Sequence, residues 1–296
     1  MSSQQYTGQN IVFIVGCQRS GTTYLQRLLA SHPKIKTGQE SFLFSWYLAP
    51  LLGNWENKEP KSLQAGRGGV GMRSYFTDED FRSVLHDFML AMMKPMIGNL
   101  QDGELFLEKT PDHALCIPAM IELLPSARFI HILRDARDNV ASLLAAGRTW
   151  GKTWAPHHTF SAAKRWVRYE QAVREGKKLV PPAQFYEVRY EELLESPVQT
   201  LKSIARFLGI EWIEANLADA VERNKPESVQ EKGTQIVRGG EFAMVSGDVV
   251  QEPKGFVRKA QPGSWKHDLN LFEKFQVWVL ARKMMREEGY PWRFPW

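Results

Sequence analysis

A short apolar run that leads directly into a glycine-bracketed loop constrains this chain more than any other feature. Ile11–Val15 is expected to be a strand buried on both faces, and the loop Gly16–Gly21 follows it. A helical pattern begins at Thr22. Strand, loop and helix N-terminus together gather backbone N–H groups and the positive end of a helix dipole around one anion. We therefore expect a phosphate-binding loop near the N-terminus.

The side chains of the loop narrow the kind of phosphate that it can hold. The spacing of Gly16 and Gly21 matches the frame of a nucleotide-triphosphatase loop, but Thr22 stands where such an enzyme has lysine. Without that lysine the loop cannot reach β- and γ-phosphates in the usual way. The Ser20, Thr22 and Thr23 hydroxyls and the Arg19 charge instead suit a single 5′-phosphate group.

Alternating strand and helix patterns predict the fold class. Further strand-like runs are expected at 34–37, 105–107, 129–133 and 185–188, with helices at 22–31, 138–146, 161–176, 197–208 and 269–288. This order is typical of βαβ units. We predict one α/β domain over residues 1–296, with a central parallel sheet flanked by helices and a P-loop-like nucleotide-binding fold. Residues 1–9 are expected to be flexible, and 53–72 and 230–255 to be long loops.

Composition and charge argue against several other functions. The formal net charge is +5, but the basic residues are scattered, so no nucleic-acid surface is expected. No run approaches the roughly 20 apolar residues of a membrane-spanning helix. The opening residues do not resemble a signal peptide, so a cytoplasmic location is expected. Cys17 and Cys116 form no metal or redox motif, and no metal is expected.

Two motifs together resemble one enzyme family. Arg19–Thr23 is similar to the 5′-phosphosulfate loop of the sulfotransferases that use 3′-phosphoadenosine 5′-phosphosulfate (PAPS). Arg134, at the end of the fourth strand, and Ser142, eight positions later, resemble the 3′-phosphate motif of that family. The resemblance implies PAPS as the sulfuryl donor. It also implies that Arg19 contacts the 5′-phosphosulfate and its bridging oxygen.

Two further segments extend the resemblance. Residues 256–266 are similar to the Arg-Lys-Gly-x-x-Gly-x-Trp-Lys segment of cytosolic sulfotransferases, with Ala260 in place of the first glycine. This implies that Arg258 and Lys259 bind the 3′-phosphate. Residues 188–193 resemble the segment after the fifth strand of that family, which implies that Tyr190 contacts adenine. On the helix that follows Arg134, we expect Asp138 to be the capping residue.

The catalytic candidates follow the second and third strands. Glu40 resembles the glutamate that is the general base of the tyrosylprotein branch. Lys109 corresponds to a lysine placed against the leaving sulfate, and the adjacent Glu108 is expected to point to the opposite face of its strand. His113 is a competing base, because many cytosolic sulfotransferases use a histidine after a similar Lys-Thr pair. We rank it second to Glu40.

The acceptor remains open at the level of sequence. A hydroxyl or amine on a carbohydrate, a glycolipid or another small molecule is favoured, and phenol and peptide hydroxyls remain possible. Aromatic residues between 42 and 55 and methionines between 89 and 96 are candidates for an acceptor pocket or for the core. Two alternatives are a small-molecule kinase on the same fold and a non-catalytic phosphoadenosine-binding module.

The two separate phosphate motifs generate a first prediction. The protein is expected to bind adenosine 3′,5′-bisphosphate (PAP) more tightly than AMP and without Mg²⁺, because only the bisphosphate engages both motifs. Titration calorimetry with PAP, AMP and ATP–Mg checks this. Tighter binding of ATP–Mg than of PAP would support the kinase alternative instead.

Overall fold

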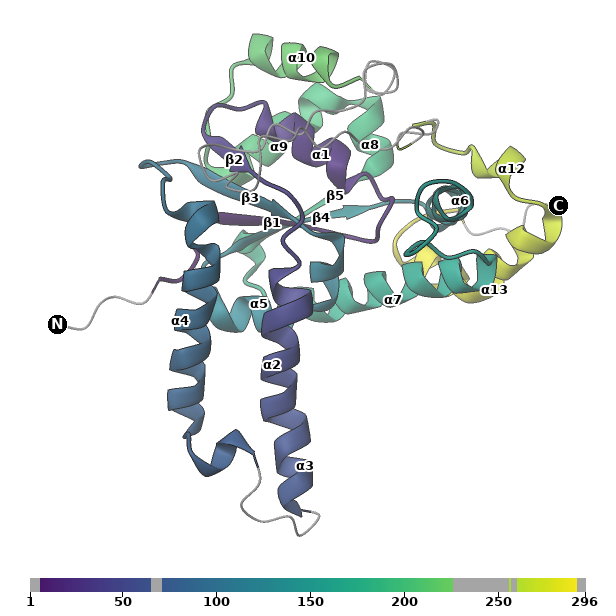
Figure 1. The fold of residues 1–296 in the computed structure, drawn as a ribbon. Coiled ribbons are helices and arrows are strands. Elements are labelled where there is room, and N and C mark those ends of the chain that lie inside the picture. The colour runs from purple at the N-terminus through teal and green to yellow at the C-terminus, as the bar shows by residue number, and fades with distance from the viewer. Residues whose placement is uncertain (1–5, 65–70, 226–255, 257–259, 292–296) are drawn as a thin grey trace.

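Five parallel strands form one sheet in the computed structural model, which describes residues 6–64, 71–225, 256 and 260–291 (Figure 1). The strands are β1 (Ile11–Val15), β2 (Ile35–Thr37), β3 (Leu105–Lys109), β4 (Arg128–Leu133) and β5 (Phe185–Arg189), in the order β2-β3-β1-β4-β5. β1 lies at the centre and pairs with β3 on one side and β4 on the other. The predicted α/β class with a central parallel sheet is confirmed.

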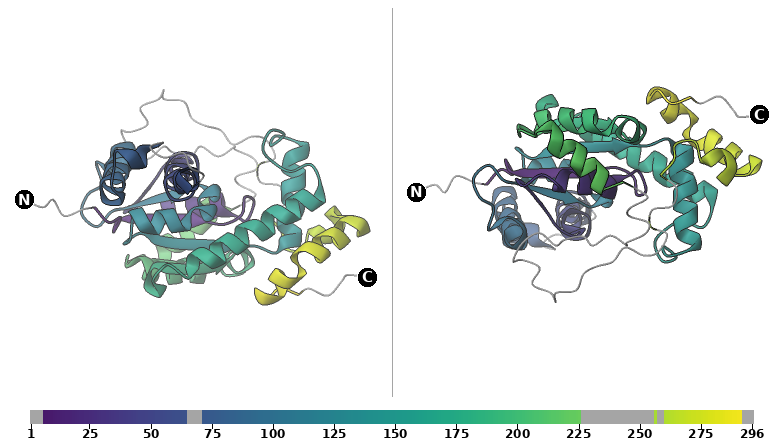
Figure 2. Two further views of the ribbon diagram at one scale, coloured as in Figure 1. Left: turned by 90° about the horizontal axis from the view of Figure 1, so that it is seen from below. Right: turned by 90° about the horizontal axis from the view of Figure 1, so that it is seen from above.

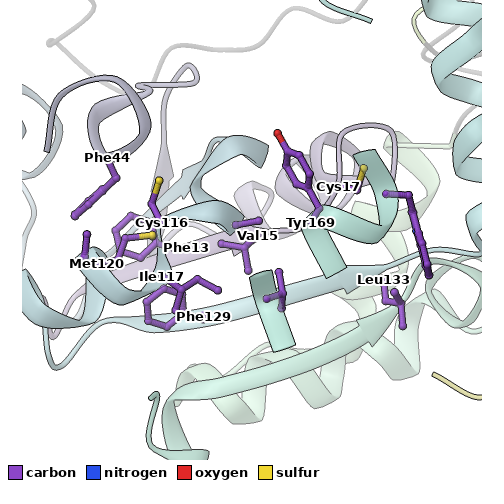
Figure 3. Close-up of a cluster of buried hydrophobic side chains, with 14 of the residues drawn as sticks. Phe13, Val15, Cys17, Phe44, Cys116, Ile117, Met120, Phe129, Leu133 and Tyr169 are labelled. Carbon is purple, nitrogen blue, oxygen red and sulfur yellow. The ribbon is translucent and has the colours of Figure 1, made fainter. Parts of the chain in front are cut away.

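Helices cover both faces of the sheet, because successive side chains of β1 point to opposite sides. Val12 and Ile14 pack under α1 (Thr22–Ala30), α8 (Tyr190–Glu195), α9 (Pro197–Leu208) and α10 (Glu214–Arg223). Phe13 and Val15 belong to a larger cluster on the other face (Figure 3). That cluster includes residues of α4 (Asp78–Ile97), α5 (Ile117–Leu123), α6 (Ala136–Arg148), α7 (Thr159–Lys177) and α13 (Leu271–Glu287). The views from below and above show the two helical layers (Figure 2).

The loop expected at 53–72 is helical over 53–64, which corrects that expectation for those residues. After α2 (Ala49–Gly53), a π-helical segment Asn54–Lys58 and α3 (Glu59–Gln64) continue alongside α4, and these helices project together from the sheet (Figure 1). Trp55 stacks on Phe81 at 4.1 Å between ring centroids, and its Nε1 donates to Asp78 Oδ1 at 2.7 Å. Apart from Gly53, the glycines that suggested a loop stand from position 66 onward. Tertiary packing therefore stabilises a helix before them.

Two other expected segments fall wholly or partly outside the described residues. The loop expected at 230–255 lies outside them, as do residues 1–5 of the segment expected to be flexible. Within that segment, Tyr6 and Thr7 are instead tied to the domain. The Tyr6 carbonyl lies 2.9 Å from the His86 Nε2 of α4, and the Thr7 carbonyl accepts from Ser126 N at 2.8 Å.

A buried charge cluster joins the sheet to α7. His131 on β4 stands opposite Glu187 of β5, 3.3 Å from its carboxylate, and its other ring nitrogen lies 2.9 Å from Glu170 of α7. Burial by itself lowers the pKa of His131. The charges and hydrogen bonds of Glu170 and Glu187 outweigh burial and raise this pKa to about 9.

The His131 cluster predicts that stability depends on pH in the alkaline range. A raised folded-state pKa adds stability that is complete below the unfolded value of about 6.5 and is lost as pH rises through about 9. Glu187→Gln should lower the His131 pKa and move this loss to lower pH. Urea unfolding of both proteins from pH 6 to pH 10 measures the effect, on the order of 1–3 kcal/mol. Coincident pH profiles would contradict it.

Candidate active site

Loops that follow four of the strands meet at one edge of the sheet, because all the strands are parallel. Residues 16–21 follow β1, 38–42 follow β2, 110–115 follow β3, and Arg134 follows β4 directly. In open α/β sheets, ligands bind at this carboxyl edge. The sequence placed Arg19, Glu40 and Arg134 in these loops and Lys109 at the end of β3, so the fold brings the predicted residues to a common edge.

The backbone of the loop after β1 needs its two glycines. Gly16 has φ 152° and Gly21 has φ 98°. A Cβ on Gly16 would lie 2.6 Å from the Ile132 carbonyl oxygen, and one on Gly21 would lie 2.3 Å from the Tyr190 ring. Between them, Arg19 adopts a left-handed conformation with φ 71°, which is strained for a residue with a side chain. Close packing against β4 and α8 therefore holds the loop in a backbone conformation with positive φ angles.

The Arg19 side chain reaches toward the predicted 3′-phosphate residues. Its Nε donates to Ser142 Oγ at 3.2 Å, and an Nη nitrogen donates to the Phe256 carbonyl. The guanidinium stands over the rings of Phe256, at 4.7 Å, and Trp150, at 5.3 Å. Residues assigned to the two phosphates of the donor thus lie in direct contact with each other. The sequence motifs did not indicate that Trp150 belongs to the site.

Arg134 connects the loop after β1 to Tyr190. Its Nη1 donates to the Arg19 carbonyl at 2.8 Å, and its guanidinium lies 4.4 Å from the centre of the Tyr190 ring. Arg134 is 7% exposed, and its Nε has no hydrogen-bond partner among the described residues. A buried unpaired donor costs roughly 1–3 kcal/mol. This donor, at the carboxyl edge of the sheet, fits a site completed by an anionic ligand.

The hydroxyls of the loop differ in their availability. Ser20 is fully buried, and its Oγ accepts from Asn139 Nδ2 at 3.0 Å. The same Asn139 amide donates to the Gln18 carbonyl at 2.9 Å. In the part of the chain that the structure describes, the Thr22 and Thr23 hydroxyls make no hydrogen bond; Thr22 is 4% exposed and Thr23 is half-buried, so Thr23 is the more accessible to a phosphate. Asn139 supports the loop from α6, and the sequence motifs gave no sign of this role.

Asp138 does not cap α6, which corrects the expectation from sequence. Asp135 is the N-cap and accepts from Arg137 N at 2.8 Å. Asp138 instead accepts from the backbone N–H groups of Gly263, at 2.6 Å, and Trp265, at 2.9 Å. It thereby fixes the segment that follows the predicted Arg258–Lys259 pair. That pair lies outside the described residues.

Glu40 and Lys109 form an ion pair at the edge of the site. Lys109 Nζ lies 2.5 Å from Glu40 Oε1. The lysine side chain is 5% exposed and the glutamate side chain 36%, so one partner is buried and the other faces solvent. Gln26 of α1 fixes the turn before Glu40 through Thr37 Oγ1 and the Gly38 carbonyl. The carboxylate is therefore both oriented and accessible.

His113 is held in the core rather than turned toward a ligand. It is fully buried, its Nδ1 lies 2.9 Å from Glu108 Oε2, and its Nε2 accepts from Phe44 N at 3.2 Å. With both ring nitrogens engaged in this way, the imidazole has no free position from which to take an acceptor proton. The geometry thus favours Glu40 over His113 as the base.

Glu108, which is buried on β3, holds the chain around His113 and Ser41 in place. Its Oε1 accepts from Ser41 Oγ at 2.7 Å and from Thr110 Oγ1 at 2.6 Å. Burial alone raises the pKa of Glu108, but His113 and the hydrogen bonds from His113, Thr110 and Ser41 outweigh it and lower this pKa. Glu108 has the structural role that the alternation of β3 predicted.

Many of the side chains considered for an acceptor pocket belong to the core instead. Phe44 and Trp55 are 1% exposed, and Met89 and Met93 are buried. Trp46 is 61% exposed and stacks on Phe42 at 4.1 Å. Within residues 6–64, 71–225, 256 and 260–291, no group of His, Cys, Asp and Glu side chains is arranged to hold a metal ion, and no helix has the length and apolarity needed to cross a membrane.

Comparison with known proteins identifies the family. The model of the sulfotransferase family matches residues 11–214, so the chain belongs to this family. The protein-tyrosine sulfotransferase of Drosophila melanogaster is 26% identical over 254 residues, which cover 84% of this chain and 48% of the relative. The chain thus spans about half the length of that relative.

Solved structures agree on the fold. A mouse sulfotransferase complexed with PAP matches with a TM-score of 0.62 and 13% identity, over 96% of this chain and 86% of the other. The sulfotransferase domain of the Synechococcus PCC 7002 olefin synthase matches with a TM-score of 0.56 and 19% identity, over 96% and 97% of the two chains. The P-loop-like fold predicted from the sequence is confirmed.

The packing of Gly21 predicts a specific defect in nucleotide binding. Gly21→Ala should weaken PAP binding about tenfold or more, because the new Cβ meets the Tyr190 ring and the backbone is left-handed. Gly38→Ala is the matched control, since its Cβ would lie 3.6 Å from the Phe106 ring, an ordinary contact. Calorimetry with PAP compares the two variants. Equal PAP affinities for them would show that the loop does not depend on this close approach.

Proposed function

We propose that the protein transfers a sulfuryl group from PAPS to a phenolic hydroxyl, and that the side chain of tyrosine is the acceptor to test first. The observation that carries the proposal is the Glu40–Lys109 pair, oriented and accessible at the same sheet edge as the Arg19 loop. The tyrosine acceptor is supported by the relatives named protein-tyrosine sulfotransferases. It replaces the carbohydrate, glycolipid and other small-molecule acceptors favoured from sequence.

The donor would be held at two places along the sheet edge. The loop residues Arg19 to Thr23 would bind the 5′-phosphosulfate, and Arg134 with Ser142 the 3′-phosphate, with Tyr190 beside the adenine. Within the described residues, the Nε of Arg134 has no hydrogen-bond partner and the half-buried Thr23 hydroxyl makes no hydrogen bond, and both observations support this fit. Arg258 and Lys259 are proposed as further 3′-phosphate ligands. When bound, PAPS supplies the sulfuryl group on a phosphate leaving group.

Glu40 is proposed to accept the proton of the acceptor hydroxyl. Lys109 engages Oε1 of the carboxylate and leaves Oε2 to take the proton. A phenol suits this base because its ordinary pKa is about 10, far below that of an alkyl alcohol. The buried Lys109 ammonium would supply fixed positive charge beside the acceptor oxygen, and Arg19 would supply it at the 5′-phosphosulfate.

The two alternatives have less support. A kinase would need positive charge at the position of Thr22, and the family match lies with sulfotransferases. A module that only binds phosphoadenosine would have no use for an accessible carboxylate paired to a buried lysine. Burying one member of such a pair costs desolvation energy, and pairs of this kind are typical of sites where they take part in the reaction.

The proposed base predicts a selective loss of transfer. Glu40→Gln should reduce turnover on the order of 10²–10⁴-fold while PAP affinity stays close to that of the wild type, because glutamine keeps the shape but accepts no proton. Glu104→Gln is a matched control, since Glu104 pairs with Lys36 at 3.1 Å in a similar carboxylate–lysine contact away from the edge. Single-turnover transfer from labelled PAPS measures the rates. Near-wild-type turnover of Glu40→Gln would rule out this assignment.

A further inference from the structure

An exposed pair of stacked aromatic rings stands directly after the proposed base. Trp46 lies over Phe42 with 4.1 Å between the ring centroids and 15° between the ring planes. Phe42 follows Glu40 by two positions, so its Cα lies within about 7 Å of the Glu40 Cα. Trp46 is 61% exposed and Phe42 is half-buried. The pair therefore presents an aromatic surface to solvent near the accessible carboxylate.

The end of β3 holds both the base and the aromatic pair. Lys109 Nζ contacts the Glu40 carboxylate at 2.5 Å, and the next residue, Thr110, accepts from the Phe42 backbone N–H at 3.4 Å through its hydroxyl. Because consecutive residues of one strand end hold Glu40 and Phe42, the place of the aromatic pair relative to the base is set by the sheet.

The backbone that carries the pair is unusual. Phe42 has φ 51° and ψ 16°, a left-handed conformation that is strained for an aromatic residue. The six residues that follow, η1 (Leu43–Leu48), form a π-helix, a rare element that is frequent at functional sites. Within this backbone, Trp46 N donates to the Phe42 carbonyl at 2.9 Å. Strain that the surrounding structure maintains is typical of ligand clamps and active sites.

The exposure of Trp46 is not explained by the packing of η1. Leu43, Phe44 and Leu48 are the residues by which η1 joins the core, and all three are buried. Trp46 lies outside that core, and the neighbouring Tyr47 is 44% exposed. Large apolar side chains that gather on the surface beside a site are typical of binding surfaces.

We propose that Trp46 binds the acceptor by stacking on its phenolic ring, and that Phe42 is the positioning residue that holds the indole in place. The inference rests on the proposed function, which puts the acceptor hydroxyl at Glu40. Phe42 covers one face of the indole, and within the described part of the chain no other ring packs on it. A planar ring stacks well on such a face. The pair therefore selects an acceptor by its aromatic ring rather than by a charged group.

Binding to the PAP-loaded protein tests this role without turnover. The probes are 4-methylphenol and 4-methylcyclohexanol, which both carry a hydroxyl on a six-membered ring but differ in aromaticity. Ligand-observed NMR titration gives their affinities. The wild type should bind the phenol about fivefold more tightly than the cyclohexanol, because only the phenol stacks. Increasing salt should leave this preference unchanged, since no charge pairing contributes to it.

Two variants remove the stack in different ways. Trp46→Ala deletes the indole, and Phe42→Gly deletes its support while glycine adopts the left-handed backbone without strain. Both should lose the preference for the phenol and keep the PAP affinity of the wild type, and Trp46→Phe should restore most of the preference. Phe272→Ala is the matched control, since Phe272 is 68% exposed on α13, and it should bind both probes like the wild type.

Steady-state kinetics separates this role from that of the base. Trp46→Ala should raise KM for the phenol about fivefold and leave kcat within about twofold, because stacking holds the ring equally before and during transfer. Glu40→Gln should instead lower kcat. The phenolic ring has two sources, a free phenol and tyrosine in a peptide, so 4-methylphenol and a tyrosine peptide flanked by glycines are both assayed. The one with the larger kcat/KM is the natural source.

Three results would overturn the proposal. They are equal binding of the two probes by the wild type, an undiminished preference in Trp46→Ala, and a wild type that sediments as a dimer while Trp46→Ala is a monomer. The last result would mean that a second copy of the chain covers the indole. Failure of the proposed function is distinguishable, because a preference for the phenol without transfer to any hydroxyl would contradict that function and still support the stacking role of Trp46.

Discussion

The contact between the β1 loop and the end of β4 is the constraint on which the rest of the site depends. Arg134 donates to the backbone of Arg19 and lies over Tyr190, whose ring closes against Gly21. This packing holds Arg19 in a left-handed conformation that a free chain would leave. It also leaves the Arg134 Nε buried with no hydrogen-bond partner among the described residues, so the same contact that shapes the loop prepares it for an anion.

Side chains alternate between the two faces of β3, and this gives neighbouring residues of the strand different roles. Glu108 and Lys109 are adjacent and therefore point to opposite faces of the sheet. Glu108 joins His113, Ser41 and Thr110 in a buried network that fixes the chain after Glu40. Lys109 reaches the accessible Glu40 carboxylate. His113 and Glu40 are both candidate bases in the sequence. They have different roles in the structure, because His113 is buried and Glu40 is accessible.

Local patterns were enough to predict most of the fold. The strands β1, β3 and β4 were found because continuous apolar runs mark strands buried on both faces, whereas the run at 34–37 was weak. The bounds predicted for α9 agree with the structure because Pro197 starts it and Gly209, at φ 68°, ends it. The helix at 59–64 was missed because the segment before it, Asn54–Lys58, is stabilised by the stacking of Trp55 on Phe81, which is distant in sequence. Asn139 and the anchoring role of Asp138 were also missed, because their partners lie more than a hundred residues away in sequence.

We propose that this chain moves a sulfuryl group from PAPS to a phenolic hydroxyl. The most direct measurement incubates the purified protein with labelled PAPS and a tyrosine peptide, and follows both products by mass spectrometry. We expect equal amounts of PAP and of peptide carrying one sulfate ester on tyrosine, without added metal. Release of PAP with no sulfated peptide or phenol, or transfer confined to carbohydrate hydroxyls, would contradict it.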